Sequence, residues 1–229
     1  MAMVEKHMPE KPSANAPAEM VGIPGGEFTA GLDPNIALAE CQKYYKNCKN
    51  GAWAMNAGPH QASVNSFFID KYEVTQAEYE RVMRSNPSKF KGSNLPVESV
   101  TWVEADTYCK RVGKRLPTEL EWEKAAKGGS DSIYSWGDDG DMADVYAWYK
   151  NNSEGKTHPV GEKSPNGYGV YDMAGNVWEW TSSFYDKSGK HKVLRGGSWY
   201  ADPNATRPAY RGTGIPGWRD SDIGLRCAR

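Results

Sequence analysis

The pattern of apolar and polar positions predicts short helices in the first half of the chain and irregular structure in the second half. Residues 76–84, 102–112 and 119–127 each follow a Thr-x-x-Glu sequence, in which the threonine and glutamate side chains cap the first turn of a helix. In the second segment, apolar residues recur at helical spacing and a glycine follows the last residue. We therefore expect three short amphipathic helices.

Strand-like segments precede these helices. Met20–Phe28 is a short strand interrupted by glycine and proline, and Val64–Val74 alternates well enough for a second strand. Beyond residue 130, short apolar runs alternate with turn sequences rich in glycine, asparagine and aspartate. This order of elements predicts an α+β domain with little regular secondary structure.

The predicted domain spans residues 20–229. Residues 1–19 are polar, contain several prolines and lack the apolar core of a signal peptide, which indicates a flexible N-terminal lead. Residues 32–62 are also polar and most simply form a surface insertion within the domain.

Composition narrows the classes of partner. The 229 residues carry 28 Lys and Arg against 29 Asp and Glu, so the net charge of −1 predicts neither a nucleic acid nor an anionic membrane surface as a partner. No apolar run is long enough to cross a membrane. The 24 glycines and 14 prolines agree with a loop-rich fold. Four cysteines without a C-x-x-C pair, and four scattered histidines, give no zinc-site spacing.

A candidate metal site lies within residues 166–180. Asp172 and Glu179 supply hard oxygen ligands, and the backbone carbonyls of Gly175 and Val177 lie between them. Ca²⁺ prefers several oxygen ligands of this kind. The alternative is a hydrogen-bonded turn in which the carboxylates cap backbone amides.

A candidate binding surface lies in the C-terminal stretch, where arginine and aromatic residues alternate among glycine and proline. Exposed Tyr, Trp and Arg are the side chains richest in binding hot spots. The alternative is a core in which tryptophans fill a loop-rich fold and arginines stack on them. The candidate residues for binding a protein or a small ligand are Trp199, Tyr200, Arg207, Tyr210, Arg211, Trp218 and Arg219.

No catalytic arrangement is evident in the sequence. Ser198 follows two glycines but lacks the G-x-S-x-G setting of a hydrolase nucleophile, and no histidine is near it in sequence. No glycine-rich loop precedes a Lys-Ser or Lys-Thr pair, so phosphate binding is not indicated. We therefore name no catalytic residue.

Four ordered motifs together resemble the formylglycine-generating enzyme (sulfatase-modifying factor) family. The motifs are GKRLPTELEWEKAA (113–126), NGYGVYDMAGNVWEW (166–180), RGGSW (195–199) and GLRCAR (224–229). The match covers about residue 20 to the end of the chain. This resemblance implies the C-type-lectin-like α+β fold of that family, with bound structural calcium.

The resemblance also implies site residues. Asp172, Gly175, Val177 and Glu179 match one family calcium site, and Asp144 with the Val145 carbonyl matches part of another. Cys109 and Cys227 match a pair that is disulfide-bonded in secreted relatives, and Cys41 and Cys48 suit a second bridge inside the insertion. Two disulfides favour an oxidising, extracytoplasmic compartment such as the periplasm. The alternative is a cytosolic protein with four thiols.

The catalytic part of the resemblance fails. Family enzymes that make formylglycine carry two cysteines shortly after the Gly-Gly-Ser turn, which bind copper and activate oxygen. Here the first corresponds to Ala201 and the second falls near Thr206, and neither supplies the thiolate that Cu(I) prefers. Trp178 and Ser198 match groove residues of the family, so we expect a cleft without this chemistry and no bound copper.

Three functions compete on this basis. We favour a non-catalytic binding or assembly module, a pseudoenzyme whose C-terminal surface holds a protein or a ligand, in one version as a subunit of a larger extracytoplasmic complex. The second is a metal-dependent oxidase or other modifying enzyme of the family. The third is a variable ligand-binding protein with diversified loop positions, for which Tyr200, Asp202, Asn204 and Thr206 are suitable.

Overall fold

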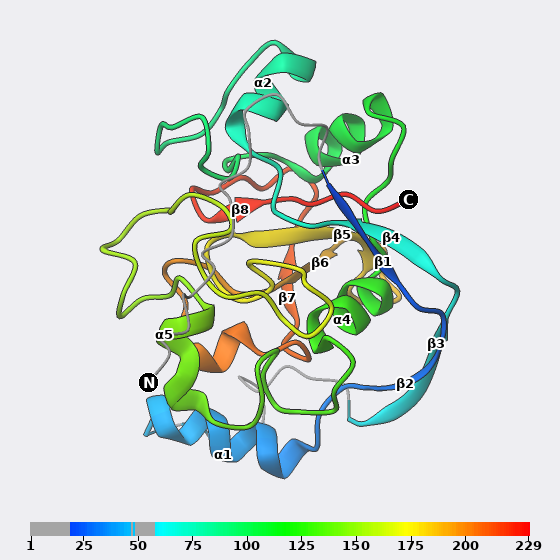
Figure 1. Cartoon of the computed structure of the whole chain (residues 1–229), viewed down its shortest axis with the longest axis vertical. Coiled ribbons are helices and arrows are strands. Elements are labelled where there is room, and N and C mark those ends of the chain that lie inside the picture. The colour runs from blue at the N-terminus through cyan, green and yellow to red at the C-terminus, as the bar shows by residue number, and fades with distance from the viewer. Residues whose placement is uncertain (1–18, 47, 49–57) are drawn as a thin grey trace, which may run out of the picture.

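Three small sheets organise the fold in the computed structural model, which describes residues 19–46, 48 and 58–229 (Figure 1). Within these residues, β1 pairs with β4, β2 pairs with β3, and the third sheet has the order β7-β6-β5-β8. Most of the predicted lead, and residues 47 and 49–57 of the predicted insertion, lie outside the described residues. The strands are β1 (Met20–Ile23), β2 (Gly26–Ala30), β3 (His60–Val64), β4 (Phe67–Asp70), β5 (Trp178–Phe184), β6 (Lys192–Arg195), β7 (Gly212–Gly214) and β8 (Ile223–Gly224).

The first two pairs form one bent ribbon. Residue Ile23 at the end of β1 is opposite Phe67, and Gly26 at the start of β2 is opposite Val64. The two predicted strands are therefore in the right place, but each is interrupted where the ribbon bends. The second prediction also extends too far, because β4 ends at Asp70.

The three helices predicted from the Thr-x-x-Glu sequences are present as α2 (Gln76–Met83), α3 (Trp102–Arg111) and α4 (Glu119–Lys127). In each, the threonine side chain accepts a hydrogen bond from the glutamate amide, and the glutamate side chain accepts one from the threonine amide. Helix α4 ends at Gly128, whose φ of 60° lies in the left-handed region. Local capping chemistry thus fixes where these helices begin.

The sequence pattern misses one helix. Helix α1 (Pro34–Tyr44) lies inside the predicted insertion and begins after Asp33, whose side chain accepts hydrogen bonds from the amides of Asn35 and Ile36. Only Ala37, Glu40 and Cys41 of this helix are buried, so its sequence shows no strong apolar stripe. Later in the chain, α5 (Ala143–Tyr146) is a single turn, and Pro203–Thr206 is a 3₁₀ turn.

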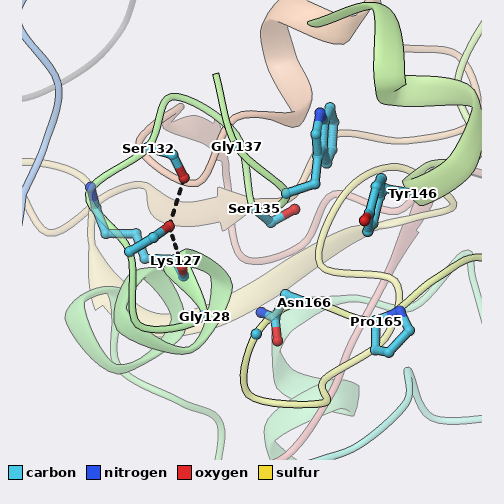
Figure 2. Close-up of a pocket in the computed structure, with 11 residues that line it drawn as sticks. Lys127, Gly128, Ser132, Ser135, Gly137, Tyr146, Pro165 and Asn166 are labelled. Atoms are coloured by element: carbon cyan, nitrogen blue, oxygen red, sulfur yellow. Dashed lines mark hydrogen bonds between the residues drawn. The ribbon is translucent and has the colours of Figure 1, made fainter. Parts of the chain in front are cut away.

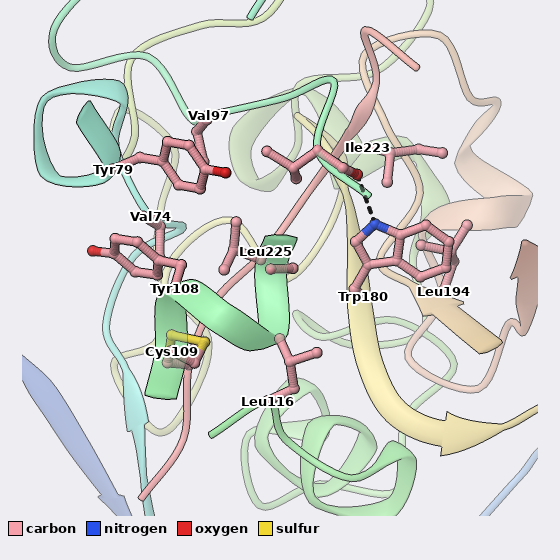
Figure 3. Packing of buried hydrophobic residues seen from close by; sticks show 13 residues of the cluster. Val74, Tyr79, Val97, Tyr108, Cys109, Leu116, Trp180, Leu194, Ile223 and Leu225 are labelled. Carbon is pink, nitrogen blue, oxygen red and sulfur yellow. Dashed lines mark hydrogen bonds between the residues drawn. A yellow bond between two sulfur atoms is a disulfide. The ribbon is translucent and has the colours of Figure 1, made fainter. Parts of the chain in front are cut away.

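The C-terminal segment, residues 223–229, crosses the molecule between β5 and helices α2 and α3 (Figure 1). Strand β8 runs parallel to β5, and Ala228 bridges both Ile69 of β4 and Arg115. Ile223 and Leu225 pack with Trp180 in the largest group of buried apolar residues (Figure 3). Helices α2 and α3 supply the other side of this core through residues such as Tyr79 and Tyr108, whose rings stack with centroids 5.3 Å apart.

Both expected disulfides are present. The Cys109–Cys227 bond joins α3 to the C-terminal segment across a sequence separation of 118 residues, and both cysteines are fully buried. The Cys41–Cys48 bond closes a short loop at the end of α1, with a separation of 7 residues. Among the described helices, none has the length and apolar character needed to span a bilayer.

Candidate functional site

A buried group of carboxylates surrounds one arginine at the candidate metal site. Asp172 is 3% exposed, Glu179 is fully buried, and Glu73, from the chain after β4, is 1% exposed beside them. The fully buried Arg226 guanidinium donates to both oxygens of Glu179 over 2.7 to 2.9 Å. The indole nitrogen of Trp122, on α4, donates to Glu179 Oε2 over 2.6 Å. Arg226, just after β8, and Trp122 of α4 therefore orient the carboxylate of Glu179.

The other two carboxylates bind backbone and amide groups. Asp172 Oδ2 accepts a hydrogen bond of 2.7 Å from the Gly161 amide. Glu73 accepts one of 3.1 Å from the Val177 amide and one of 2.6 Å from the Asn176 side chain. Glu73 thus caps an amide of the turn and Asp172 caps an amide of a neighbouring loop, as in the alternative to a metal site, whereas Glu179 binds Arg226 and Trp122.

The buried group nevertheless carries surplus negative charge. Glu73, Asp172 and Glu179 are three carboxylates against the single guanidinium of Arg226. Burial, followed by the charges of Asp172 and Glu179, raises the pKa of Glu73 well above its ordinary value. Burial also raises the pKa of Asp172, to about 6. With all three carboxylates ionised, two negative charges would lack a counter-charge, and a divalent cation would supply it in place of protons.

Few groups at this position could bind a metal ion. Within the described part of the chain, no three His, Cys, Asp or Glu side chains converge in an arrangement that could hold a metal. The predicted set needs only two side chains, since the carbonyls of Gly175 and Val177 supply the rest. Glu179 would have to share its oxygens with Arg226, whereas Asp172 has one oxygen without a hydrogen-bond donor among the described residues.

The second predicted calcium fragment lies in α5 and has other partners. The Asp144 carboxylate accepts hydrogen bonds from the Tyr149 hydroxyl at 2.8 Å and the Asn152 side chain at 3.2 Å. The Lys163 amine donates to the Asp144 carbonyl, and the Val145 carbonyl accepts a backbone hydrogen bond of 3.0 Å. The lysine places a positive charge beside the carbonyl, so a cation at this position would compete with it.

The predicted binding surface separates into an exposed and a buried part. Tyr200 is 66% exposed and Trp218 is 43% exposed. Two residues that the sequence did not single out are exposed near Trp218, namely Ile215 at 55% and Val103, on the first turn of α3, at 57%. We call Val103, Ile215 and Trp218 the C-terminal patch.

Hydrogen bonds hold this patch together. The Trp102 amide donates to the Pro216 carbonyl over 3.1 Å, which fixes the loop around residue 216 against the start of α3. Arg219, the exposed cation predicted there, pairs with Glu104 at 3.1 Å. Exposed apolar side chains gathered beside polar neighbours are typical of protein-binding sites.

Two predicted surface residues are not on the surface. Arg207 is fully buried and donates to the Asn204 carbonyl over 2.8 Å, and Ser198 is 1% exposed and donates to Asp222 over 2.9 Å. The expectation of an exposed position is wrong for both: the turn before Arg207 packs against α1 and buries it, and the Ser198 hydroxyl is held inside the fold by Asp222. The remaining candidates are half-buried, namely Trp178, Trp199, Asp202, Tyr210 and Arg211.

The positions that correspond to the family's copper-binding cysteines carry no thiol. Ala201 is half-buried, and Thr206 is fully buried, with its hydroxyl donating to the Pro203 carbonyl over 2.8 Å. Helix α1 contacts the 3₁₀ turn 203–206, and the Tyr45 hydroxyl, just after this helix, donates to the Asp202 carboxylate. The insertion therefore covers the segment in which family chemistry would take place.

Sequence reasoning missed three residues of these sites. Glu73 and Arg226 are distant in sequence from the Asp172 motif, and no spacing links them to it. Tyr45 belongs to the insertion, whose packing no local pattern indicates. Arg226 does lie inside the GLRCAR motif, so the motif was a signal for its importance but not for its partner.

The described geometry defines a C-type-lectin-like domain: small sheets, short capped helices and a C-terminal strand beside an aromatic, glycine-rich motif. A model of the sulfatase-modifying factor enzyme 1-like domain matches residues 5–229, and the chain belongs to this family.

Several proteins are similar to this chain. Chaperone protein LppX of Paenibacillus barcinonensis is 31% identical over 227 residues, which cover 73% of this chain and 81% of LppX. The inactive C-alpha-formylglycine-generating enzyme 2 of Mus musculus is 41% identical over 150 residues, covering 58% of this chain and 49% of that protein. The structure of Treponema denticola variable protein 1 has a TM-score of 0.79 and 30% identity, covering 91% of this chain and 94% of that protein.

Proposed function

We propose that this chain is a non-catalytic binding or assembly module that uses its C-terminal patch to hold a protein partner. The observation that carries this proposal is the state of residues 201–206. They supply no thiol, Thr206 is fully buried, and Tyr45 of the insertion binds Asp202 above them. A copper site of the family type needs two accessible thiolates at these positions, so the chain keeps the fold and lacks the means for that reaction.

The relatives support a binding role. Two of the named proteins are an inactive member of the enzyme family and a chaperone, and a third is a variable protein with a similar structure. The C-terminal patch gives such a role a physical basis, because Val103, Ile215 and Trp218 expose apolar surface that a partner would bury. An exposed apolar patch suits a protein partner, whereas a small molecule binds in a concave pocket.

The proposed compartment is extracytoplasmic. Two buried disulfides, Cys41–Cys48 and Cys109–Cys227, use every cysteine of the chain. Disulfides of this kind form and persist in oxidising compartments and are rare in the cytosol. The partner is therefore expected among exported proteins, and the chain would act as a subunit of a complex there.

We further propose calcium as a structural ion of this domain. Asp172 and Glu179 with the carbonyls of Gly175 and Val177 would hold it, and the surplus negative charge of the buried carboxylates supports it. Calcium would supply the missing positive charge and tie the turn to β5. Asp144 and Val145 support a second ion less well, because the Lys163 amine already binds the Asp144 carbonyl.

The test combines partner capture with an activity assay. The chain is crosslinked in its own host, purified, and compared with the double variant Ile215→Ser/Trp218→Ser. Phe68→Ser serves as the control, because Phe68 is 53% exposed but lies on β4, outside the patch. We expect one exported protein in stoichiometric amount with the wild type and the control, and its loss with the double variant. Equal recovery with all three proteins would contradict the proposal, as would oxygen consumption by the copper-loaded chain with a thiol substrate.

A second candidate, the variable ligand-binding protein, has support from the similarity to the Treponema denticola variable protein. The structure restricts where variation could occur. Tyr200 is exposed and Asp202 is half-buried, whereas Asn204 is 2% exposed and Thr206 is fully buried, so changes at the latter two would disturb packing. A template repeat beside the coding region, with differences confined to exposed positions, is the expected finding for this candidate.

A further inference from the structure

A second site lies apart from the C-terminal patch. A pocket of about 420 Å³ opens between the end of α4, the loop 130–137, α5 and residues 165–167 (Figure 2). It shares no residue with the C-terminal patch or with the buried carboxylates. Its volume is near the lower end of the range for small-molecule pockets, roughly 300–1,000 Å³.

Two hydroxyl groups in this pocket have no hydrogen-bond partner among the described residues. Ser135 is only 8% exposed, and its hydroxyl lies on the same opening as the phenol of Tyr146 (Figure 2). Both hydroxyls face the opening, so they are free to bind water or a ligand there without giving up a hydrogen bond within the protein. Both groups can donate and accept hydrogen bonds.

The walls around these hydroxyls are held in place. The Trp136 ring stacks between Tyr134 and Tyr146, with centroids 4.7 and 5.5 Å away, and its indole nitrogen donates to the Asp139 carbonyl over 2.9 Å. On the opposite wall, the Asn166 amide donates to the Ala125 carbonyl over 2.6 Å. A preformed wall reduces the ordering that binding requires.

The other two serines of the lining, Ser130 and Ser132, already have partners. Ser132 donates to the Tyr134 carbonyl over 2.8 Å, and Ser130 donates to the Lys127 carbonyl over 3.1 Å. They shape the loop, which leaves Ser135 and Tyr146 as the side-chain hydroxyls available to a ligand.

Most of the lining is uncharged and polar. Among the eleven lining residues, Lys127 alone carries charge at neutral pH. The rest are hydroxyl, amide and glycine backbone groups beside the rings of Tyr146 and Pro165, since both faces of Trp136 are covered by Tyr134 and Tyr146. A saccharide ring matches both features, because its hydroxyls exchange hydrogen bonds while its C–H face packs on rings.

From these observations we infer that the pocket binds one neutral saccharide ring, with its hydroxyl groups on Ser135 and Tyr146. This site is independent of the proposed protein-binding function, since it lies on other residues. It would give the module a second, carbohydrate ligand.

The test is a saturation-transfer NMR titration with glucose, galactose, mannose and N-acetylglucosamine at millimolar concentration. We expect at least one sugar to bind. Ser135→Ala and Tyr146→Phe should each weaken binding about two- to tenfold, as expected for one lost hydrogen bond. Tyr146→Ala, which also removes the ring, should abolish it. Ser93→Ala is the matched control, because Ser93 is an exposed serine outside the pocket.

The outcomes separate the two functions. No binding by any of the four sugars would overturn the inference, and so would binding that is unchanged in the folded Ser135→Ala and Tyr146→Phe variants. Near-ultraviolet circular dichroism establishes that each variant is folded. The Ile215→Ser/Trp218→Ser variant should bind the sugar like the wild type, so failure of the protein-binding proposal leaves this result intact.

Discussion

Removing the Cys109–Cys227 disulfide is expected to destabilise the domain far more than removing Cys41–Cys48. A disulfide restricts the unfolded chain, and in the chain-entropy model this restriction grows with the logarithm of loop length. The two bonds close sequence separations of 118 and 7 residues. The model gives about 5 kcal/mol for the long loop and about 2.5 kcal/mol for the short one.

The native state adds to this difference. Cys109 and Cys227 are fully buried beside Leu116 and Leu225 (Figure 3), so replacing both sulfurs with hydrogen leaves a small cavity in the core. The Cys41–Cys48 bond holds only the end of α1. Its loss would therefore loosen α1 before it affects the rest of the domain.

Urea unfolding of the wild type, Cys41→Ala/Cys48→Ala and Cys109→Ala/Cys227→Ala measures the effect, with tryptophan fluorescence and far-ultraviolet circular dichroism as probes. The two probes must give the same transition for the free energies of unfolding to be compared. Equal losses in the two variants, or a larger loss for the short loop, would refute the loop-length argument.

The remaining predictions concern the metal, one ion pair and one helix cap. Calcium should raise the Tm above that of EGTA-treated protein, because an ion that binds only the folded state stabilises it, and magnesium should not; scanning fluorimetry that shows no calcium effect would count against the site. Burial opposes ionisation of Glu119, but Arg195 and Arg211 outweigh it and hold the pKa below its ordinary 4.5. The ionised form stabilises the fold above the unfolded pKa of 4.5, and this contribution is lost as the pH falls through the lowered pKa of the folded state. Glu119→Gln should therefore flatten the fall of the urea midpoint below about pH 4.5, and parallel curves of midpoint against pH would contradict this. Thr118→Ala removes the cap of α4 and should lower the free energy of unfolding by about 1 kcal/mol, and an unchanged urea midpoint would argue against the cap.

Local chemistry explains what the sequence could predict. Thr75, Thr101 and Thr118 each carry their helix signal within four residues, and all three helices begin where expected. Asp33 and Pro34 are also a helix-start pair, but the segment after them has few buried residues, so its polar composition suggested an insertion without a helix.

Long-range packing explains the rest. Glu73 and Arg226 contact the Asp172 motif only because separate strands meet there, and no pattern along the chain shows that meeting. We expected Arg207 to be a surface cation because the C-terminal stretch around it is rich in glycine, proline and aromatic residues. The fold of residues 201–207 buries it instead. The aromatic and arginine composition of this stretch serves both the core and the surface, so composition alone cannot separate the two.

The C-terminal segment, residues 223–229, lies in the middle of the fold but follows every other described helix and strand along the chain, so it is synthesised after them. Until it leaves the ribosome, β5 lacks one neighbour, Cys109 lacks its partner, and the carboxylates around Asp172 lack the Arg226 cation. The earlier part of the domain therefore cannot reach its final packing before residues 223–229 have emerged. The nascent domain should remain open until then and reach its native packing afterwards.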